Sequence, residues 1–441
     1  MREALARVEA IRESRQVQQA WRAVDEVVRE NQRRVLDAFQ RAGVAQYQLA
    51  GTSGYGYNDP ARQAVEAVYA YVFGAEAALV RPQIVSGTHA LAAAIFGVLR
   101  PGDELLALGR PYDTLTTLIG VTPDARGRLA PGNLREWGIG YREVPIPPGL
   151  ARAVAAGGPR AEDEYARLAR TVEAAIGPRT RLLLLQRSRG YSQRPSLPVA
   201  AIGEVAQAVH ARHPQVVVLV DNCYGEFVEV TEPSMAGADL VAGSLIKNPG
   251  GGLAPGGGYL VGRQDLIEGA AAHLTAPGLG REIGPFHDFA RLILQGLFLA
   301  PHIVGEALRG AILAAAYFQS LGWPVDPRPG DPRTDIIQAI QFPSALALLA
   351  AVRAVQSASP IDARVRPEPA PMPGYSDPVV MAAGTFIQGA SLELTADAPL
   401  RPPFTLFWQG GLTREHVEIA LARVACTLDQ ELVTRSEGRE G

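Results

Sequence analysis

The hydrophobic pattern divides the chain into three parts. Residues 3–42 place apolar side chains at helical spacing, which predicts a long N-terminal helix. Short apolar runs then alternate with helical stretches, and a strongly apolar helical stretch over 286–321 leads into a last region that mixes both patterns. We therefore predict a helical arm over 1–50, a large domain over 51–300, and a linking helix with a smaller α+β domain over 301–441.

The alternation in the large domain predicts an α/β fold with a mostly parallel sheet covered by helices on both faces. Ligands of such sheets collect at the carboxyl ends of the strands, so Tyr112, Asp221 and Lys247, which each follow an expected strand, should meet there. The strands are expected at 77–80, 83–85, 104–108, 142–146, 181–186, 216–220, 240–244 and 258–261, and those of the C-terminal domain at 336–342, 379–382 and 405–407.

Composition narrows the class of protein. A hydrophobic content of 47% with 20% charged residues is typical of a globular protein, and a net charge of -3 favours neither nucleic acid nor an anionic membrane as partner. The two cysteines, Cys223 and Cys426, cannot build a disulfide framework. The N-terminal stretch is charged and no uninterrupted apolar run reaches the length of a membrane span. We therefore expect a cytoplasmic protein.

Lys247 lies among small and apolar residues, with no acidic residue near it in the sequence. Loss of hydration should lower the pKa of such a lysine and allow its amine to react with an aldehyde. Asp221 ends an apolar strand, where its carboxylate either pairs with a protonated pyridine nitrogen or caps the next segment. The pair suggests that Lys247 holds pyridoxal 5'-phosphate and that Asp221 contacts the ring nitrogen.

A candidate phosphate site follows another expected strand. Ser86, Gly87 and Thr88 open a helix, where unpaired amide groups and the helix dipole favour an anion. An ordinary helix cap explains the same residues. Ser244 lies three residues before Lys247, and its hydroxyl is a second candidate for binding the same phosphate.

Two further residues have less specific signals. Tyr112 either stacks on a flat heteroaromatic ring or is a half-buried loop tyrosine. Arg401 precedes a strand of the C-terminal domain, and its planar guanidinium suits a substrate carboxylate, although Arg187 and Arg189 compete for that role. No cluster of His, Cys, Asp or Glu has the spacing of a metal site, so we expect no metal.

The chain contains long motifs at residues 54–59, 86–90, 220–227, 244–251, 372–375, 381–386 and 409–413. In this order they resemble the motifs of the fold-type I pyridoxal-phosphate enzymes. More narrowly, the chain resembles the methionine gamma-lyase-like or aluminium-resistance proteins, relatives of the cystathionine gamma-synthase and beta-lyase group, and the resemblance covers nearly the whole chain.

The resemblance implies that Lys247 carries the cofactor, that Asp221 pairs with its ring nitrogen and that Tyr112 stacks on the ring as a catalytic residue. It also implies a homotetramer, a dimer of dimers in which a tyrosine and an arginine reach the phosphate from the neighbouring subunit. Residues matched to these roles are Tyr57 for the phosphate, Tyr55 and Arg401 for the substrate, Arg62 as a weak candidate for the arginine, and Ser86, Gly87, Thr88 and Ser244 for the phosphate within the subunit.

The implied activity is that of a carbon–sulfur lyase that converts a sulfur amino acid into a 2-oxo acid, ammonia and a thiol. The sequence leaves open whether the leaving group departs from the beta or the gamma carbon. It also leaves open a gamma-replacement synthase, an aminotransferase, and a non-catalytic stress-response protein that keeps the fold.

Overall fold

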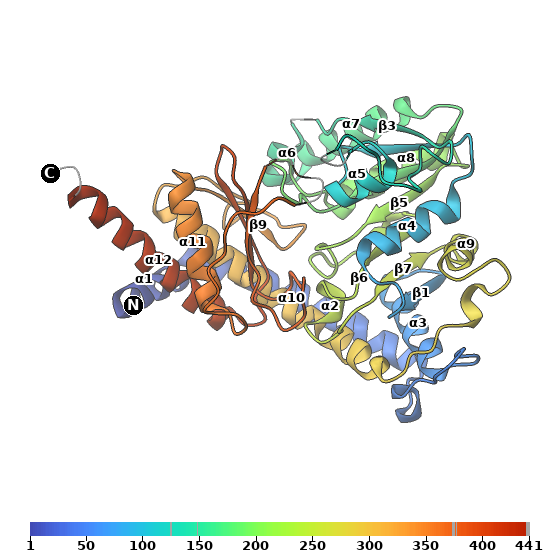
Figure 1. Ribbon diagram of the computed structural model, residues 1–441, viewed down its shortest axis with the longest axis horizontal. Coiled ribbons are helices and arrows are strands. Elements are labelled where there is room, and N and C mark those ends of the chain that lie inside the picture. The colour runs from blue at the N-terminus through green and yellow to red at the C-terminus, as the bar shows by residue number, and fades with distance from the viewer. Residues whose placement is uncertain (124–125, 148, 373–374, 376, 438–441) are drawn as a thin grey trace.

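The computed structural model describes residues 1–441 except 124–125, 148, 373–374, 376 and 438–441. Two sheets dominate it (Figure 1). The larger has the strand order β1-β7-β6-β5-β4-β2-β3, in which β7 alone runs antiparallel to its neighbours. Its strands are β1 Ala77–Arg81, β2 Glu104–Leu108, β3 Gly140–Val144, β4 Thr180–Gln186, β5 Val217–Asp221, β6 Leu240–Ser244 and β7 Gly258–Gly262.

Helices cover both faces of this sheet, because alternate residues of each strand enter different cores. In β5, Val218 and Val220 join the core on one face, whereas Val217 and Leu219 join the core on the other. This confirms the α/β prediction. The helices of this part of the chain are α3 Pro60–Phe73, α4 Gly87–Val98, α5 Asp113–Ile119, α6 Leu150–Ala156, α7 Pro159–Ala175, α8 Val199–Arg212 and α9 Gln264–Leu274.

The N-terminal region forms two helices, α1 (Arg2–Arg12) and α2 (Arg15–Ala42), where the sequence predicted one. The break occurs at Ser14, whose hydroxyl accepts a hydrogen bond from the amide of Val17 and so begins a new helix. Helix α1 packs on the C-terminal helix α12 (Arg414–Glu437), so the first and last helices of the chain contact each other (Figure 1).

Helix α10 (Phe289–Ser320) connects the two sheets, since it packs against α2 and α3 and also against strands of the smaller sheet. By length and composition alone this helix is apolar enough to cross a membrane. However, 78% of its most apolar window is buried inside the protein, as expected for a core helix.

The smaller sheet is antiparallel, with the order β10-β11-β12-β9-β8, and it confirms the α+β character of the C-terminal region. The expected strand at 83–85 is absent, and β11 was missed because Asp397 and Pro399 are unfavourable in strands. The remaining elements are β8 Val325–Asp326, β9 Ile337–Gln341, α11 Ala345–Ala358, β10 Val379–Ala382, β11 Thr395–Pro399 and β12 Thr405–Gln409.

Candidate active site

The carboxyl ends of β5 and β6 place the main candidates at one edge of the large sheet. Asp221 is the last residue of β5 and Ser244 the last of β6, and the two strands pair in parallel. Helix α4 begins against both strand ends: a Cβ added to Gly87 would lie 3.3 Å from Cys223 Sγ and 3.4 Å from Ser244 Cβ. The fold therefore brings the expected phosphate turn and the strand-end residues together.

Lys247 follows β6, and its side chain turns towards the same edge. Its Nζ lies 4.0 Å from the ring centroid of Tyr224, and the residue as a whole is only partly buried. Burial lowers the pKa of Lys247, but its neighbours raise it by more, with Cys223 and Tyr224 ahead of Asp221. The net pKa lies well above its ordinary value. The expectation of a lowered pKa was therefore wrong, because the fold brings Cys223, Tyr224 and Asp221, which favour the charged form, close to Lys247 from another part of the sequence.

Asp221 is 4% exposed and its Oδ1 accepts a hydrogen bond from the amide of Cys223 at 3.1 Å. Burial raises the pKa of Asp221, and the positive charge of Lys247 opposes that increase. Its carboxylate therefore makes the local turn that the sequence allowed, and it lies close enough to Lys247 for the two charges to interact. A buried acid of this kind gains stability from a cationic partner.

The first turn of α4 combines a cap with free amides. Ser86 Oγ accepts a hydrogen bond from the amide of His89 at 3.1 Å, so its hydroxyl serves as the helix cap. The amides of Gly87 and Thr88 precede this bond, in the turn where helix geometry supplies no acceptor. The ring of His89 accepts from the amide of Val85 at 3.2 Å, a local structural role.

Tyr112 lies beside this turn. Its hydroxyl is 2.9 Å from Thr88 Oγ1, and its amide donates to Gln186 Oε1 at 2.9 Å from the end of β4. Burial is the main cause that raises the pKa of Tyr112, with Asp221 adding to it and the Thr88 hydrogen bond opposing it. Tyr112 is therefore a neutral phenol, held by two contacts at the edge where Asp221 and Lys247 lie.

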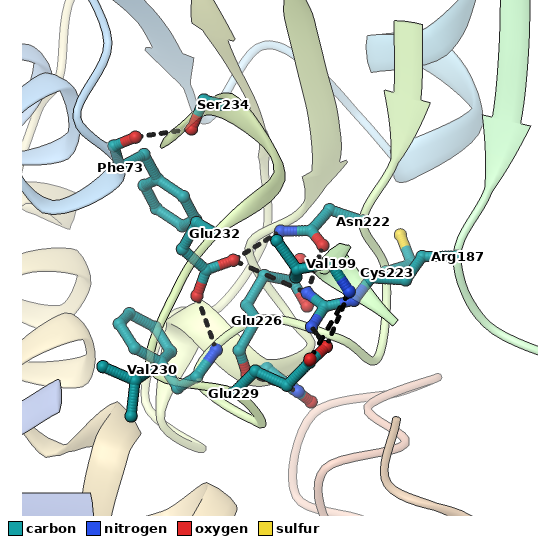
Figure 2. Close-up of polar contacts among 12 residues, drawn as sticks. Phe73, Arg187, Val199, Asn222, Cys223, Glu226, Glu229, Val230, Glu232 and Ser234 are labelled. Atoms are coloured by element: carbon teal, nitrogen blue, oxygen red, sulfur yellow. Dashed lines mark hydrogen bonds and ion pairs between the residues drawn. The ribbon is translucent and has the colours of Figure 1, made fainter. Parts of the chain in front are cut away.

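The opposite side of the β5 end holds a different cluster of charges (Figure 2). Arg187 Nη1 donates to Asn222 Oδ1 and Nη2 to Glu229 Oε2, both at 2.7 Å. Glu232 accepts from Asn222 Nδ2 at 3.0 Å and from the amide of Phe227 at 2.9 Å. We call Arg187, Asn222, Glu229 and Glu232 the buried network; both terminal nitrogens of the Arg187 guanidinium are engaged with protein groups in it.

The other candidate arginines differ in whether their guanidinium groups could bind a ligand. Arg189 pairs with Asp326, which leaves it, like Arg187, bound within the protein. Arg401 forms an ion pair with Asp377 at 3.2 Å, and its side chain is half-exposed. Arg62 is buried and its guanidinium donates to backbone carbonyls, which assigns it to holding the 54–59 loop rather than to a phosphate; the acceptors are Gly56, Gly284 and Glu282.

Tyr55 and Tyr57 lie on the same loop. They are 75% and 56% exposed, and their ring centroids are 5.8 Å apart. The structure does not pair them with Lys247 within one chain among the residues it describes, so their assigned roles stay predictions that depend on a second subunit.

Two signals were missed from the sequence. Tyr224 has a positive φ of 72°, a strained conformation for a tyrosine, and it presents its ring to Lys247. More simply, Lys247 is the only lysine among 441 residues, a count that was available from the sequence. Within the described part of the chain, no group of three or more His, Cys, Asp or Glu residues is arranged to hold a metal ion.

Comparisons with known proteins show which proteins the whole chain resembles. A carbon-sulfur lyase involved in aluminium resistance from Clostridium novyi NT is 41% identical, with a TM-score of 0.85 and 96% of each chain covered. A Listeria monocytogenes protein, whose suggested activity is that of a cystathionine beta-lyase involved in aluminium resistance, is 45% identical, with a TM-score of 0.87 and coverage of 97% of this chain and 100% of its own. The uncharacterized protein YnbB of Bacillus subtilis (strain 168) is 46% identical over 409 residues, 92% of this chain and 93% of its own.

More distant matches define the fold. The pyridoxal-5'-phosphate dependent protein YhfS from Escherichia coli is 19% identical, with a TM-score of 0.58 over 92% of this chain and 97% of its own. The fold is that of the fold-type I pyridoxal-phosphate enzymes. The model of the methionine gamma-lyase family matches residues 7–428, and this chain therefore belongs to that family.

Proposed function

We propose that this protein is a pyridoxal-phosphate-dependent carbon–sulfur lyase that acts on a sulfur amino acid. One observation carries the proposal: the only lysine of the chain lies at the edge of the large sheet beside Asp221. The chain has 42 lysine and arginine residues in total, and the other 41 are all arginines. Arginine preserves a positive charge, but its guanidinium cannot serve as an amine nucleophile at neutral pH. A single retained lysine is what amine chemistry requires.

The residues around Lys247 fit pyridoxal 5'-phosphate. The narrow space at Gly87 and the free amides of the α4 turn suit a phosphate, with Thr88 and Ser244 as hydroxyl donors. Asp221 supplies a carboxylate for the ring nitrogen, and Tyr112 an aromatic face. When bound, the cofactor supplies an electron sink for charge that develops at the substrate Cα.

The residues of the chain then have defined tasks. Lys247 Nζ would hold the cofactor, and the same amine would remove the proton from the substrate Cα. Asp221 would pair with a protonated ring nitrogen, and this would weaken one of the contributions that raise the pKa of Lys247. Arg401 is our candidate for the substrate carboxylate. Carbon–sulfur cleavage then gives a 2-oxo acid, ammonia and a thiol with the uptake of one water.

We further propose a homotetramer with shared active sites. The exposed rings of Tyr55 and Tyr57 support it, because two adjacent tyrosines on a glycine-rich loop present apolar surface to solvent. In the assembly, Tyr57 would reach the phosphate of the neighbouring subunit and Tyr55 its substrate. Tyr57→Phe should weaken cofactor binding without changing the elution volume in size-exclusion chromatography, and elution of the wild type as a monomer would contradict the shared site.

The single lysine makes the main test unusually direct. Incubation with pyridoxal 5'-phosphate followed by borohydride reduction should add one pyridoxyl group per chain, and peptide mass spectrometry should place it on Lys247. Methionine, cystathionine and cysteine are then assayed for 2-oxo acid and thiol. Absence of the label on Lys247 would contradict the cofactor assignment. Labelling without turnover of any of the three would contradict the lyase, and product that appears only with an added thiol or 2-oxo acid would indicate a replacement or transamination reaction.

A further inference from the structure

The smaller sheet turns one face towards the active-site edge. The paired residues Ala339, Phe407, Asp397 and Met381 form a row across β9, β12, β11 and β10. Tyr224 and Tyr191 pack on this face against Ala339 and Phe407. Lys247 Nζ lies over the ring of Tyr224. Aromatic side chains of this cluster therefore lie between the amine of Lys247 and Asp397.

Asp397 has an unusual environment within this face. It is 6% exposed, and its Oδ2 accepts hydrogen bonds from Tyr191 Oη at 2.8 Å and from Gln409 Nε2 at 2.7 Å. Both donors are neutral. Burial therefore raises the pKa of Asp397 to about 7, although the two hydrogen bonds oppose the increase. An asparagine could accept the same two bonds without the cost of a buried acid.

Two side-chain oxygens near Asp397 could also accept hydrogen bonds that they do not receive from the described residues. Gln409 Oε1 and Thr395 Oγ1 are buried and have no hydrogen-bond partner among the residues that the structure describes. Thr395 and Gln409 are directly paired across the two strands, one step along the sheet from Asp397 and Phe407. The patch therefore gathers acceptors, and a primary ammonium, which has three donors and no acceptor, is the common group that suits such a patch.

We propose that Asp397 is a specificity-determining residue that binds an ammonium group on the sulfur-bound leaving group of the substrate. This inference rests on the lyase proposed above and narrows its substrate class to thioether amino acids whose departing thiol carries an amine. Tyr191 and Gln409 hold the carboxylate, and the rings of Tyr224 and Phe407, which belong to the same packed cluster, would contact the methylene groups between sulfur and nitrogen. The ion pair forms out of bulk water, where a charge-assisted hydrogen bond contributes most.

Two thioethers of nearly equal shape test the proposal. S-(2-aminoethyl)-L-cysteine ends in an ammonium, whereas S-propyl-L-cysteine ends in a methyl group; the homocysteine counterparts of both are included in case the enzyme cleaves at the gamma carbon. The cofactor-loaded wild type should show a kcat/KM at least about tenfold higher for the aminoethyl compound. Asp397→Asn should remove most of that preference and leave kcat/KM for the propyl compound within about threefold.

A second readout is the concentration of each thioether that half-saturates the change in cofactor absorbance, which reports binding without turnover. The control is Asp265→Asn, an exposed aspartate on α9, which should change neither preference. Equal kcat/KM for the two wild-type substrates, or a preference that survives Asp397→Asn, would overturn the inference while the lyase stands. Turnover of none of the thioethers would overturn this inference, and the proposed lyase falls with it only if methionine, cystathionine and cysteine are not turned over either. If Asp397→Asn does not fold, the wild-type preference decides.

Discussion

The charged residues on the two sides of the β5 end differ in how many hydrogen bonds and ion pairs they make with the rest of the protein. On one side, Asp221 and Lys247 lie at the sheet edge with few hydrogen bonds; on the other, Asn222 belongs to the buried network with Arg187 (Figure 2). Adjacent residues of one strand end point to these two sides. In the buried network each carboxylate meets several donors, among them the Arg187 guanidinium and backbone amides.

This difference suggests that the charged groups of the buried network stabilise the fold, whereas Asp221 and Lys247 are available to bind a ligand. Burial is the largest cause of the raised pKa of Asp221, and its cationic neighbour is the only lysine of the chain. Arg34 of α2 adds a further ion pair to Glu232, at 3.3 Å, so the network also fixes the N-terminal arm to the domain. We therefore expect substitutions on the site side to change chemistry and substitutions in the network to change stability.

The largest effect is expected for Lys247→Arg, which keeps the positive charge and removes the amine. Turnover should fall by at least about 10²–10⁴-fold, because the group that holds the cofactor and moves the Cα proton is lost. Borohydride reduction in the presence of pyridoxal 5'-phosphate should leave no label. Arg33→Lys is the matched control: it adds a lysine at an exposed site on α2 and should keep full activity. Residual activity above about a tenth of wild type would contradict the role of Lys247.

Arg187→Met tests the network side. The substitution leaves the carboxylate of Glu229 without its guanidinium partner and leaves Glu232 with Arg34 alone, and breaking a buried pair in this way costs about 3–5 kcal/mol. Urea denaturation should show that loss, whereas kcat per bound cofactor should stay within about threefold. A large loss of kcat with unchanged stability would show that the two sides of β5 are not separable.

Asp221→Asn should give the reverse result. Activity should fall about 10²-fold, because an amide cannot keep a ring nitrogen protonated as a carboxylate does. Stability in the absence of cofactor should be equal or higher at neutral pH, since the fold raises the pKa of Asp221 and its ionised form is therefore disfavoured by folding. Turnover assays and urea denaturation of the cofactor-free protein measure the two effects, and a fall in stability without a fall in turnover would reverse the assignment.

The sequence predicted the site side better than the network side. Strand-end positions identified Asp221 and Lys247, because parallel strands deliver their carboxyl ends to one edge and an apolar run marks the strand. The partners of Arg187 lie in the loop after β5, where no periodicity predicts which side chains meet. From the sequence, Arg187 is a candidate for binding the substrate carboxylate, but in the structure its guanidinium binds Asn222 and Glu229 instead.

The same limit explains other differences in the fold. β11 was missed because Asp397 and Pro399 argue locally against a strand, and the tertiary pairing with β10 and β12 overrides that preference. The pKa of Lys247 was given the wrong direction because its direction depends on spatial neighbours rather than sequence neighbours. Ser14 is a capping residue inside a continuous helical pattern, and it was read as part of the helix.

Gly87→Ala tests how closely the phosphate turn fits its ligand. The added Cβ would meet Cys223 Sγ at 3.3 Å and Ser244 Cβ at 3.4 Å, so the turn must move slightly away from the strand ends. Cofactor affinity should fall about tenfold, which corresponds to about 1.4 kcal/mol. Gly256→Ala is the control, because a Cβ there meets nothing within 4 Å. Equal cofactor affinity in the two variants, measured by titration of the cofactor absorbance, would show that this turn does not contact the phosphate.

Glu226 belongs to neither side and gives the smallest effect. It is fully buried behind β6, its Oε1 accepts from Tyr259 Oη at 2.7 Å, and burial raises its pKa from 4.5 to about 8. Because the folded protein holds this proton more tightly than the unfolded chain, the stability that Glu226 contributes is fully present below pH 4.5 and is lost as the pH rises to about 8. Glu226→Gln should remove this part of the pH dependence, so the variant should gain on wild type by about 1 kcal/mol between pH 6 and pH 7 in urea denaturation. A stability difference that is the same at both pH values would show that Glu226 is ionised in the fold and that the boundary between the two sides lies elsewhere.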